Sequence, residues 1–166
     1  MALTLNGNTN TITPVSAVQP AGAILQVVYG TYSTEVESTS SSYIDSGLSQ
    51  AITPSKTGSQ MLVIVNQHMS IYRAARDNGL GLKLIQDSTA RYTSAQNWQW
   101  YMDVDNASAI AWRGNITFVS KHAHGISAGT STTYKTQFRT YTDANSGKVA
   151  AQKSGLESSL TIMEIA

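Results

Sequence analysis

The stretch QMLVIVN, residues 60–66, decides the fold class of this chain. Its five central residues are all apolar, and three of them, Val63, Ile64 and Val65, are β-branched. A run this short and this rich in β-branched residues is typical of a strand rather than a helix. Because it contains no alternation of polar and apolar residues, we expect both faces of the strand to be covered.

Further short apolar stretches lie on both sides of residues 60–66, separated by clusters of Ser, Thr, Asn, Gly and Pro. They occupy residues 23–29, 43–52, 80–85, 91–102, 109–120, 132–141, a few residues around Val149, and 160–165. This pattern predicts about eight strands and no helix. The fold class is therefore all-β, and two packed antiparallel sheets in a jelly-roll-like sandwich are the simplest way to close it.

Several details of these strands follow from single residues. Gly47 predicts a bulge within its strand, and Gly114 with Asn115 predicts a kink. Residues 73–79 carry charges and a turn-forming Asn-Gly pair, so we expect a connecting loop there. Residues 132–141 alternate, which places Tyr134 and Phe138 on one face of their strand.

The composition excludes several classes of function. Only 13% of the 166 residues are charged and the formal net charge is +1, which argues against binding to nucleic acid or to an anionic membrane surface. The absence of Cys excludes disulfides and thiolate chemistry. No apolar run reaches the ~18 residues of a membrane span. The 21 Ser and 19 Thr, about a quarter of the chain, suit strands better than helices.

The first 22 residues differ from the rest and predict an extended docking arm, followed by a sandwich domain at residues 23–166. Three Asn and a Gly interrupt any apolar face, and Pro14 and Pro20 each remove a backbone hydrogen-bond donor. The arm has few residues to bury, so it is either mobile or held by a neighbouring protein. Its candidate docking residues are Leu3, Leu5, Ile12, Val15 and Val18.

His122 and His124 form a candidate metal site. In an extended segment they lie on one face, about 7 Å apart. Two imidazoles are too few for a closed zinc site, but three copies around a threefold axis would offer six nitrogens. The alternatives are a solvated loop, which we favour, and a packed or hydrogen-bonded pair. No other cofactor is expected.

Trp98, Trp100 and Tyr101 form an aromatic cluster. Alternation places both Trp residues on one side of a strand, where they could stack on a sugar ring or enter a pocket of a partner. Packing within the core or against another subunit is the favoured alternative.

Three motifs of known catalytic sites are absent: a phosphate-binding Gly-x-x-x-x-Gly-Lys loop, a His-Glu-x-x-His pair and a dinucleotide-binding fingerprint. The letters Gly-x-Ser-x-Gly occur once, at residues 125–129, but no helix is predicted after them, and the nucleophile turn of that motif joins a strand to a helix. We therefore expect a protein that is not an enzyme.

The order of several motifs resembles a family of small virion structural proteins and fibre-terminal domains of marine and cyanobacterial tailed phages. The motifs are ALTLNGNTN at 2–10, GAILQVV at 22–28, YIDSGLS at 43–49, AITP at 51–54, MLVIV at 61–65, TTYKTQFR at 132–139 and LTIMEIA at 160–166. The family often has an Asp-Ser-Pro-like turn before the Thr-Thr-Tyr strand. Here KHAHG at 121–125 stands in that region, so the role of this loop is not carried over.

The resemblance implies a β-sandwich that serves as a non-enzymatic part of a bacteriophage virion, in the form of a homotrimer. An arm of about 22 residues reaches at most roughly 75 Å, too little for a fibre shaft, which favours a capsid decoration or cement protein on the head. The alternative is a tail fibre or tail-associated component that binds a host surface glycan. Expected partners are the chain itself and the major capsid protein or other virion proteins. The expected location is the outer surface of the virion, after synthesis in the bacterial host cytoplasm.

Overall fold

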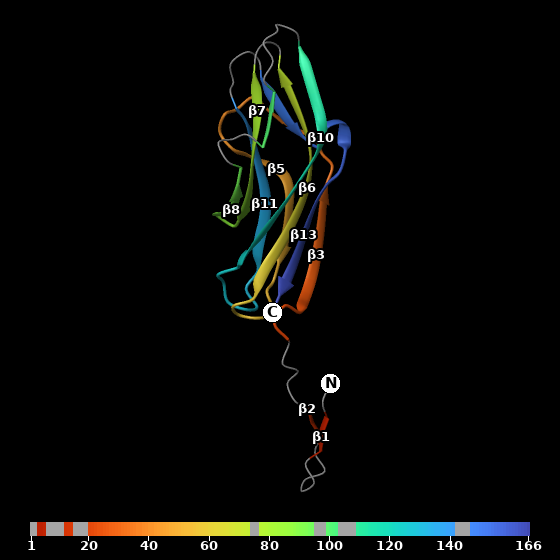
Figure 1. Cartoon of the computed structure of the whole chain (residues 1–166), viewed down its shortest axis with the longest axis vertical. Coiled ribbons are helices and arrows are strands. Elements are labelled where there is room, and N and C mark those ends of the chain that lie inside the picture. Colours follow the sequence, from red (N-terminus) through yellow and green to blue (C-terminus); the bar gives the residue numbers. More distant parts are fainter. Residues whose placement is uncertain are drawn as a thin grey trace.

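The computed structural model describes residues 3–5, 12–14, 20–73, 77–94, 99–102, 109–141 and 147–166. Two antiparallel sheets pack face to face as a β-sandwich, as the strand pattern predicts (Figure 1). The six-stranded sheet contains β3 (Ile24–Tyr32), β4 (Val36–Ser38), β6 (Gln60–Arg73), β10 (Ile110–Ala123), β12 (Lys148–Ala151) and β13 (Ser158–Ile165). The five-stranded sheet contains β5 (Ile44–Ile52), β7 (Asn78–Gln86), β8 (Thr89–Thr93), β9 (Trp100–Met102) and β11 (Thr132–Thr140).

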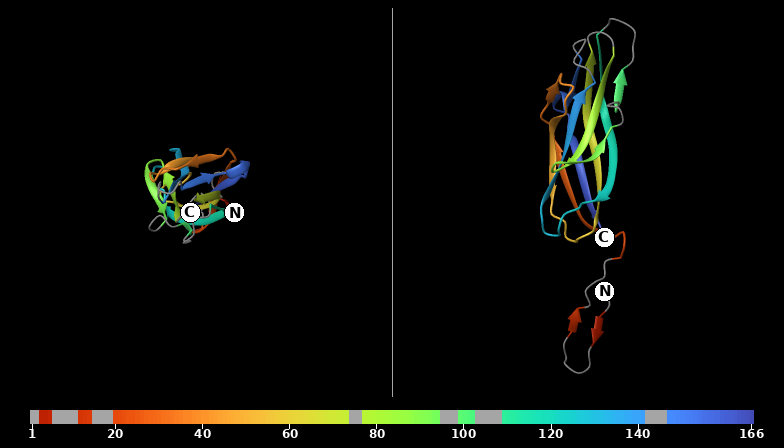
Figure 2. Two further views of the ribbon diagram at one scale, coloured as in Figure 1. Left: turned by 90° about the horizontal axis from the view of Figure 1, so that it is seen from above. Right: turned by 90° about the vertical axis from the view of Figure 1, so that its left-hand side faces the viewer.

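The long strand β6 organises the six-stranded sheet. It pairs along its whole length with β10 on one edge. Its other edge is shared, because β13 pairs with residues 60–66 and β12 pairs with residues 69–72. The six-stranded sheet therefore has two halves, one continuing through β13 to β3 and the other through β12 to β4. Figure 2 shows β10 running the length of the sandwich beside these strands.

The core lies between the inner faces of the two sheets. In β7, Leu80, Leu82 and Leu84 are fully buried, and in β11 so are Tyr134 and Phe138, as their alternation predicts. β13 pairs on both edges, with β3 and with β6, so the last strand is internal to its sheet.

A buried polar network crosses the centre of this core. Thr136 donates to Gln67 Oε1 at 2.7 Å and contacts the hydroxyl of Ser46 at 2.5 Å. Gln67 Nε2 in turn donates to Ser158 Oγ at 3.1 Å. The amide of Gln152 completes the network when its oxygen accepts from Ser158 Oγ at 3.0 Å. These bonds satisfy groups that would otherwise be costly to bury, and they tie the two sheets together.

The bulge predicted at Gly47 is present. Between the pairs Lys135 with Ser49 and Gln137 with Asp45, β5 has three residues where β11 has one. Gly47 has a φ of 87°, in the region that favours glycine.

Three other sequence-based expectations are wrong in part. β10 pairs with β6 without a register shift, so there is no kink at Gly114, whose missing side chain instead leaves room for the Trp100 ring. The loop expected at 73–79 is shorter at both ends, because β6 includes Arg73 and β7 begins at Asn78. The Asn78 side chain donates to the Tyr72 carbonyl at 2.8 Å. The expectation that both faces of residues 60–66 are covered fails for the outer face, where Leu62 and Ile64 are only half-buried.

The two strands of the predicted arm, β1 (Leu3–Leu5) and β2 (Ile12–Pro14), pair with each other in an antiparallel hairpin. Within the described residues they join neither sheet of the sandwich (Figure 1). The sandwich itself begins at the junction with β13, where Gly22 donates to the Ala166 carbonyl and Ala166 donates to the Ala23 carbonyl. Among the described residues no helix has the length and apolar character needed to cross a membrane.

Candidate functional site

The outer face of the six-stranded sheet carries a continuous apolar surface over β3, β13, β6 and β10. The strand register places Val27, Met163 and Leu62 in one row across the sheet, and Tyr29, Thr161, Ile64 and Val119 in the next. Ile24 and Ile165 lie at the end of the same face. We call this surface the apolar band; it consists of Ile24, Val27, Tyr29, Leu62, Ile64, Val119, Met163 and Ile165.

The apolar band is unusually exposed for its composition. Ile24 is 59% exposed, Val27 52%, Tyr29 61% and Val119 55%. The next row beyond Tyr29, which contains Thr31, is polar and marks one boundary of the band. Contiguous exposed apolar surface of this kind marks an interaction site more often than isolated exposed residues do.

The outer face of the five-stranded sheet has the opposite character. Asp45 accepts from Lys135 at 2.8 Å and from Gln137 at 2.7 Å. The ammonium group of Lys83 lies 4.0 Å from the centre of the Tyr43 ring. Burial and these two hydrogen bonds act in opposite directions on Asp45, and the net effect lowers the pKa of its carboxyl. This face is therefore a conventional solvated surface, so the two sides of the sandwich differ in what they can bind.

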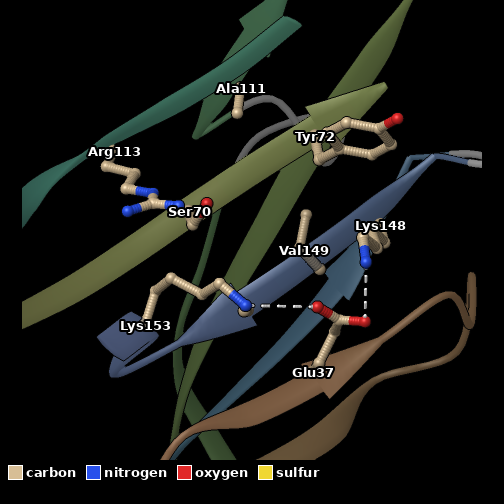
Figure 3. A pocket seen from close by; sticks show the side chains of 9 residues that line it. Glu37, Ser70, Tyr72, Ala111, Arg113, Lys148, Val149 and Lys153 are labelled. Carbon is tan, nitrogen blue, oxygen red and sulfur yellow. Dashed lines mark hydrogen bonds and ion pairs between the residues drawn. The ribbon is translucent and has the colours of Figure 1, made fainter. Parts of the chain in front are cut away.

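A pocket of about 360 Å³ opens on the other half of the six-stranded sheet (Figure 3). The register puts Glu37, Ala150, Ser70 and Arg113 in one row across β4, β12, β6 and β10. The two small side chains of Ala150 and Ser70 thus lie between the long charged side chains of Glu37 and Arg113. With strands about 4.8 Å apart, Glu37 and Arg113 are roughly 14 Å apart along the row. The hollow forms because the small side chains in the middle of the row leave space between the long side chains at its ends.

The rim of the pocket is polar and mostly cationic. Lys148 and Lys153 both form ion pairs with Glu37, at 3.1 and 3.6 Å, and Figure 3 shows both ammonium groups directed at that carboxylate. Lys153 also pairs with Glu35 at 2.5 Å, which lowers the pKa of Glu35 and raises that of Lys153. On the opposite side, the guanidinium of Arg113 has no hydrogen bond or ion pair to any residue that the structure describes. We call this site the basic pocket.

The histidine pair faces the interior of the sandwich. His124 is only 1% exposed, so the solvated loop favoured for the pair is wrong. Its Nε2 lies 3.2 Å from the Lys56 carbonyl oxygen, to which it donates, and its Nδ1 accepts from the Ile126 amide at 3.3 Å. Both nitrogens of this ring are therefore occupied, and a metal ion would have to displace these hydrogen bonds.

His122 lies two residues earlier on the same inner face. Its Nε2 is 2.9 Å from the Tyr134 hydroxyl and its Nδ1 is 3.2 Å from Ser120 Oγ. Burial, together with the positive charge of Arg91, lowers the pKa of His122 to about 4, so the ring is neutral at pH 7. The packed, hydrogen-bonded alternative describes the pair. In the described part of the chain no three His, Asp or Glu side chains form a metal-binding group.

The aromatic cluster separates into two parts. Trp100 is half-buried and packs against the core, 6.2 Å from the Trp112 ring. Tyr101 points to the other face, where its hydroxyl donates to Asp77 at 2.9 Å and its ring contacts Tyr141 edge to face. Trp98 lies outside the described residues. The core-packing alternative therefore accounts for Trp100.

The structure describes three of the five predicted docking residues of the arm. Leu3 and Leu5 belong to β1 and Ile12 to β2, where the register pairs Leu5 with Ile12. Val15 and Val18 lie outside the described residues. The docking role of all five stays a prediction.

The basic pocket was not predicted from the sequence. Its four charged residues come from three distant segments, which contain Glu37, Arg113, and Lys148 with Lys153. The pairing of β4, β12, β6 and β10 brings these segments together. The sequence does contain a signal for the apolar band, because the apolar residues Val27 and Tyr29 alternate with residues that face inward. A strand that is apolar on both faces can indicate an external contact as well as a second covering layer.

No protein-family model and no curated protein matches the chain. Solved structures with a similar arrangement include one of infectious bursal disease virus, Gx strain, with 14% identity and a TM-score of 0.40, covering 100% of this chain and 42% of that chain. A crystal structure of an infectious bursal disease virus VP2 subviral particle has 11% identity and a TM-score of 0.29, covering 100% and 45%. The chain thus spans less than half the length of these proteins. Similarity at this level carries no argument about function.

Proposed function

We propose that this chain is a non-enzymatic structural protein of a bacteriophage virion, acting as a homotrimeric decoration or cement protein on the outer surface of the head. The observation that carries the proposal is the apolar band. It covers parts of four strands, with Lys121 beside Leu62 at its β10 edge, and lies opposite a face whose charged groups are paired or solvated. Such a surface is stabilised when another apolar surface removes it from water, at about 25 cal/mol per Å².

A second copy of the chain is the occupant that we favour for the apolar band. Closed point-group symmetry is the usual solution for a protein that associates with itself, and the same patch then contributes to every interface. The mostly aliphatic composition of the band resembles the core of a subunit interface, from which charged residues are depleted. The trimer specifically follows from the phage-protein resemblance of the sequence.

The arm supplies the second contact in this proposal. Each trimer would present three arms to the major capsid protein or to a neighbouring trimer. Three weak contacts on one body bind far more strongly than one, because the second and third form at a high effective concentration. Binding to the assembled head alone then stabilises the particle by mass action, without a catalytic step.

The experiment is to introduce a charge into the apolar band and measure the mass of the protein in solution. Tyr29→Lys places an ammonium group at the most exposed residue of the band, where its desolvation opposes association. We expect the wild type to elute as a trimer in size-exclusion chromatography with light scattering. The concentration below which the trimer dissociates should be about tenfold higher for the variant, or more, because its association is weaker. Thr31→Lys is the matched control, on the same strand and face but outside the band.

The control variant should remain trimeric. A wild-type protein that stays monomeric at high concentration would contradict the proposal. So would a Tyr29→Lys protein with unchanged association. A tail-associated location would appear instead as labelled protein at the tail in electron micrographs of the particle.

A further inference from the structure

One cationic group of the basic pocket has no hydrogen-bond or ion-pair partner among the residues that the structure describes. The guanidinium of Arg113 has five N–H donors and makes no hydrogen bond within the described residues, whereas Lys148 and Lys153 are already paired with Glu37. Arginine recognises carboxylates through two parallel hydrogen bonds. The side of the pocket formed by β10 therefore suits a planar anion.

The size of the pocket argues for more than a simple anion. Its volume is about 360 Å³. An inorganic phosphate or a single acidic side chain would leave most of that space to water. The volume is within the range of pockets that hold organic ligands.

The floor of the pocket argues against an extended peptide. β12 pairs with β4 and β6, and β6 pairs with β12 and β10, so the floor strands have no free edge. A bound peptide would find no backbone partners for its own amides, which is how extended peptides usually bind to sheets. The ligand has to be recognised by side chains alone.

The remaining side chains suit a ligand rich in hydroxyl groups. The Glu37 carboxylate is held in place by two lysines and can accept further hydrogen bonds, while the lysines can donate. Ser70 contributes a hydroxyl at the floor, and Tyr72 lies beside it on the next row. Figure 3 shows Arg113 on one side of the hollow and Glu37 with Lys148 and Lys153 on the other.

From these observations we infer that the basic pocket binds a carboxylate-bearing sugar unit of an acidic polysaccharide. The sugar carboxylate pairs with Arg113, and its ring hydroxyls contact Glu37, Lys148 and Lys153. This binding site goes beyond the proposed structural role and does not depend on it, since the pocket lies on the β4 and β12 half of the sheet and the apolar band on the β3 and β13 half.

The experiment is a titration of the full-length protein with a tetramer of galacturonic acid, followed by calorimetry or by chemical shifts. The neutral galactose tetramer is the matched ligand. We expect the acidic tetramer to bind and the neutral one to bind about tenfold more weakly or worse. Added salt should weaken binding of the acidic tetramer, because the pair with Arg113 is open to solvent.

Two variants locate the binding. Arg113→Gln should reduce the affinity for the acidic tetramer about tenfold or more. Lys121→Gln removes a charge from the same strand and the same outer face, away from the pocket, and should leave the affinity unchanged. Ala111→Phe, at an exposed position on the pocket wall, should block the site without altering the thermal unfolding of the protein.

The inference is overturned if Arg113→Gln binds as tightly as the wild type, or if the neutral tetramer binds equally well. It is also overturned if inorganic phosphate or a tetraglutamate peptide competes with equal affinity, because the pocket would then recognise charge or peptide rather than sugar. The oligomeric state of the protein does not enter these measurements, so their outcome is separate from that of the proposed trimer.

Discussion

Glu164 has a fully buried carboxylate whose surroundings are set by the fold. Its position on β13 continues the inward-facing series of Leu160 and Ile162, and its side chain is 0% exposed. The carboxylate accepts hydrogen bonds from the amides of Ser55 and Lys56, from the hydroxyls of Ser55 and Ser59, and from Gln26 Nε2. Burial alone would raise the pKa of Glu164, but these donors outweigh it and lower the pKa to about 2.

Replacing this carboxylate should destabilise the protein in a pH-dependent way. Glu164→Gln puts an NH₂ group among donors, and we expect a loss of roughly 3 kcal/mol in the free energy of unfolding at pH 7. The wild-type carboxyl has a pKa of about 2 when folded and about 4.5 when unfolded, so its contribution is complete above pH 4.5. It disappears as the pH falls toward 2. The difference between the two proteins should therefore shrink over this range.

Denaturant unfolding at pH 7, 4 and 2.5 measures this difference. Glu157→Gln is the control, because Glu157 is exposed and its substitution should change stability by no more than about 0.5 kcal/mol. A constant difference between Glu164→Gln and the wild type at all three pH values would show that the carboxylate charge is not what stabilises the site.

At the scale of elements, the bulge in β5 determines where the inter-sheet polar network can form. The bulge contains Ser46, whose hydroxyl reaches Thr136 across the strand pair. Gly47 beside it has a φ of 87°, and a Cβ at this position would lie 2.1 Å from the ring of Tyr32. Conformation and space both require glycine there.

These two requirements can be separated by comparing two alanine variants. Gly47→Ala should lose about 3 kcal/mol or more of stability, since it adds a clash with Tyr32 to an unfavourable φ. Gly129→Ala has nearly the same φ, 82°, but no atom within 4 Å of the added Cβ, so it should lose only about 1 to 2 kcal/mol. Thermal and urea unfolding at equal protein concentration measure both. Equal losses would mean that Tyr32 moves aside without cost.

Strand identity and inward-facing residues were largely predictable from the sequence, because alternation and turn residues are local. Residues 132–141 predicted the buried side of β11, and Gly47 predicted the bulge. The prediction of a kink at Gly114 is wrong. A glycine can either allow a bend or leave space for a neighbouring side chain, and here the neighbour is the Trp100 ring, which belongs to another strand. The short strand β4 (Val36–Ser38) was missed, since three residues carry no readable periodicity.

The candidate sites were less predictable, because they depend on which strands become neighbours. Arg113 and Glu37 are ordinary surface residues until the register places Ser70 and Ala150 between them. Similarly, the apolar residues on the outer face of β6 predict that another layer covers them. The sequence alone does not distinguish a layer formed by the same chain from the surface of another molecule.

At the scale of the whole molecule, the sandwich has one charged face, one face divided between the apolar band and the basic pocket, and a separately paired hairpin at its beginning. Gly22 and Ala23 are already fixed by hydrogen bonds to Ala166, and β1 pairs only with β2 within the described residues. Among the described residues, the contacts with the sandwich therefore begin at Gly22, the last residue of the predicted arm. Self-association and attachment to a larger particle can accordingly be tested one at a time.

Deleting residues 2–20 should leave the sandwich folded and trimeric but abolish its attachment to virus heads. The truncation spares the Gly22 and Ala166 pairing, so the melting temperature should stay within a few degrees of the full-length value. Attachment is measured by co-sedimentation with expanded heads that lack the protein. Since the three arms act together, loss of all three should weaken binding by about a hundredfold or more, below detection in this assay. Leu5→Ser, which changes one arm residue and leaves the length intact, should give an intermediate loss. A truncated protein that binds heads with unchanged affinity would exclude the arm as the attachment element and direct the search to the sandwich faces.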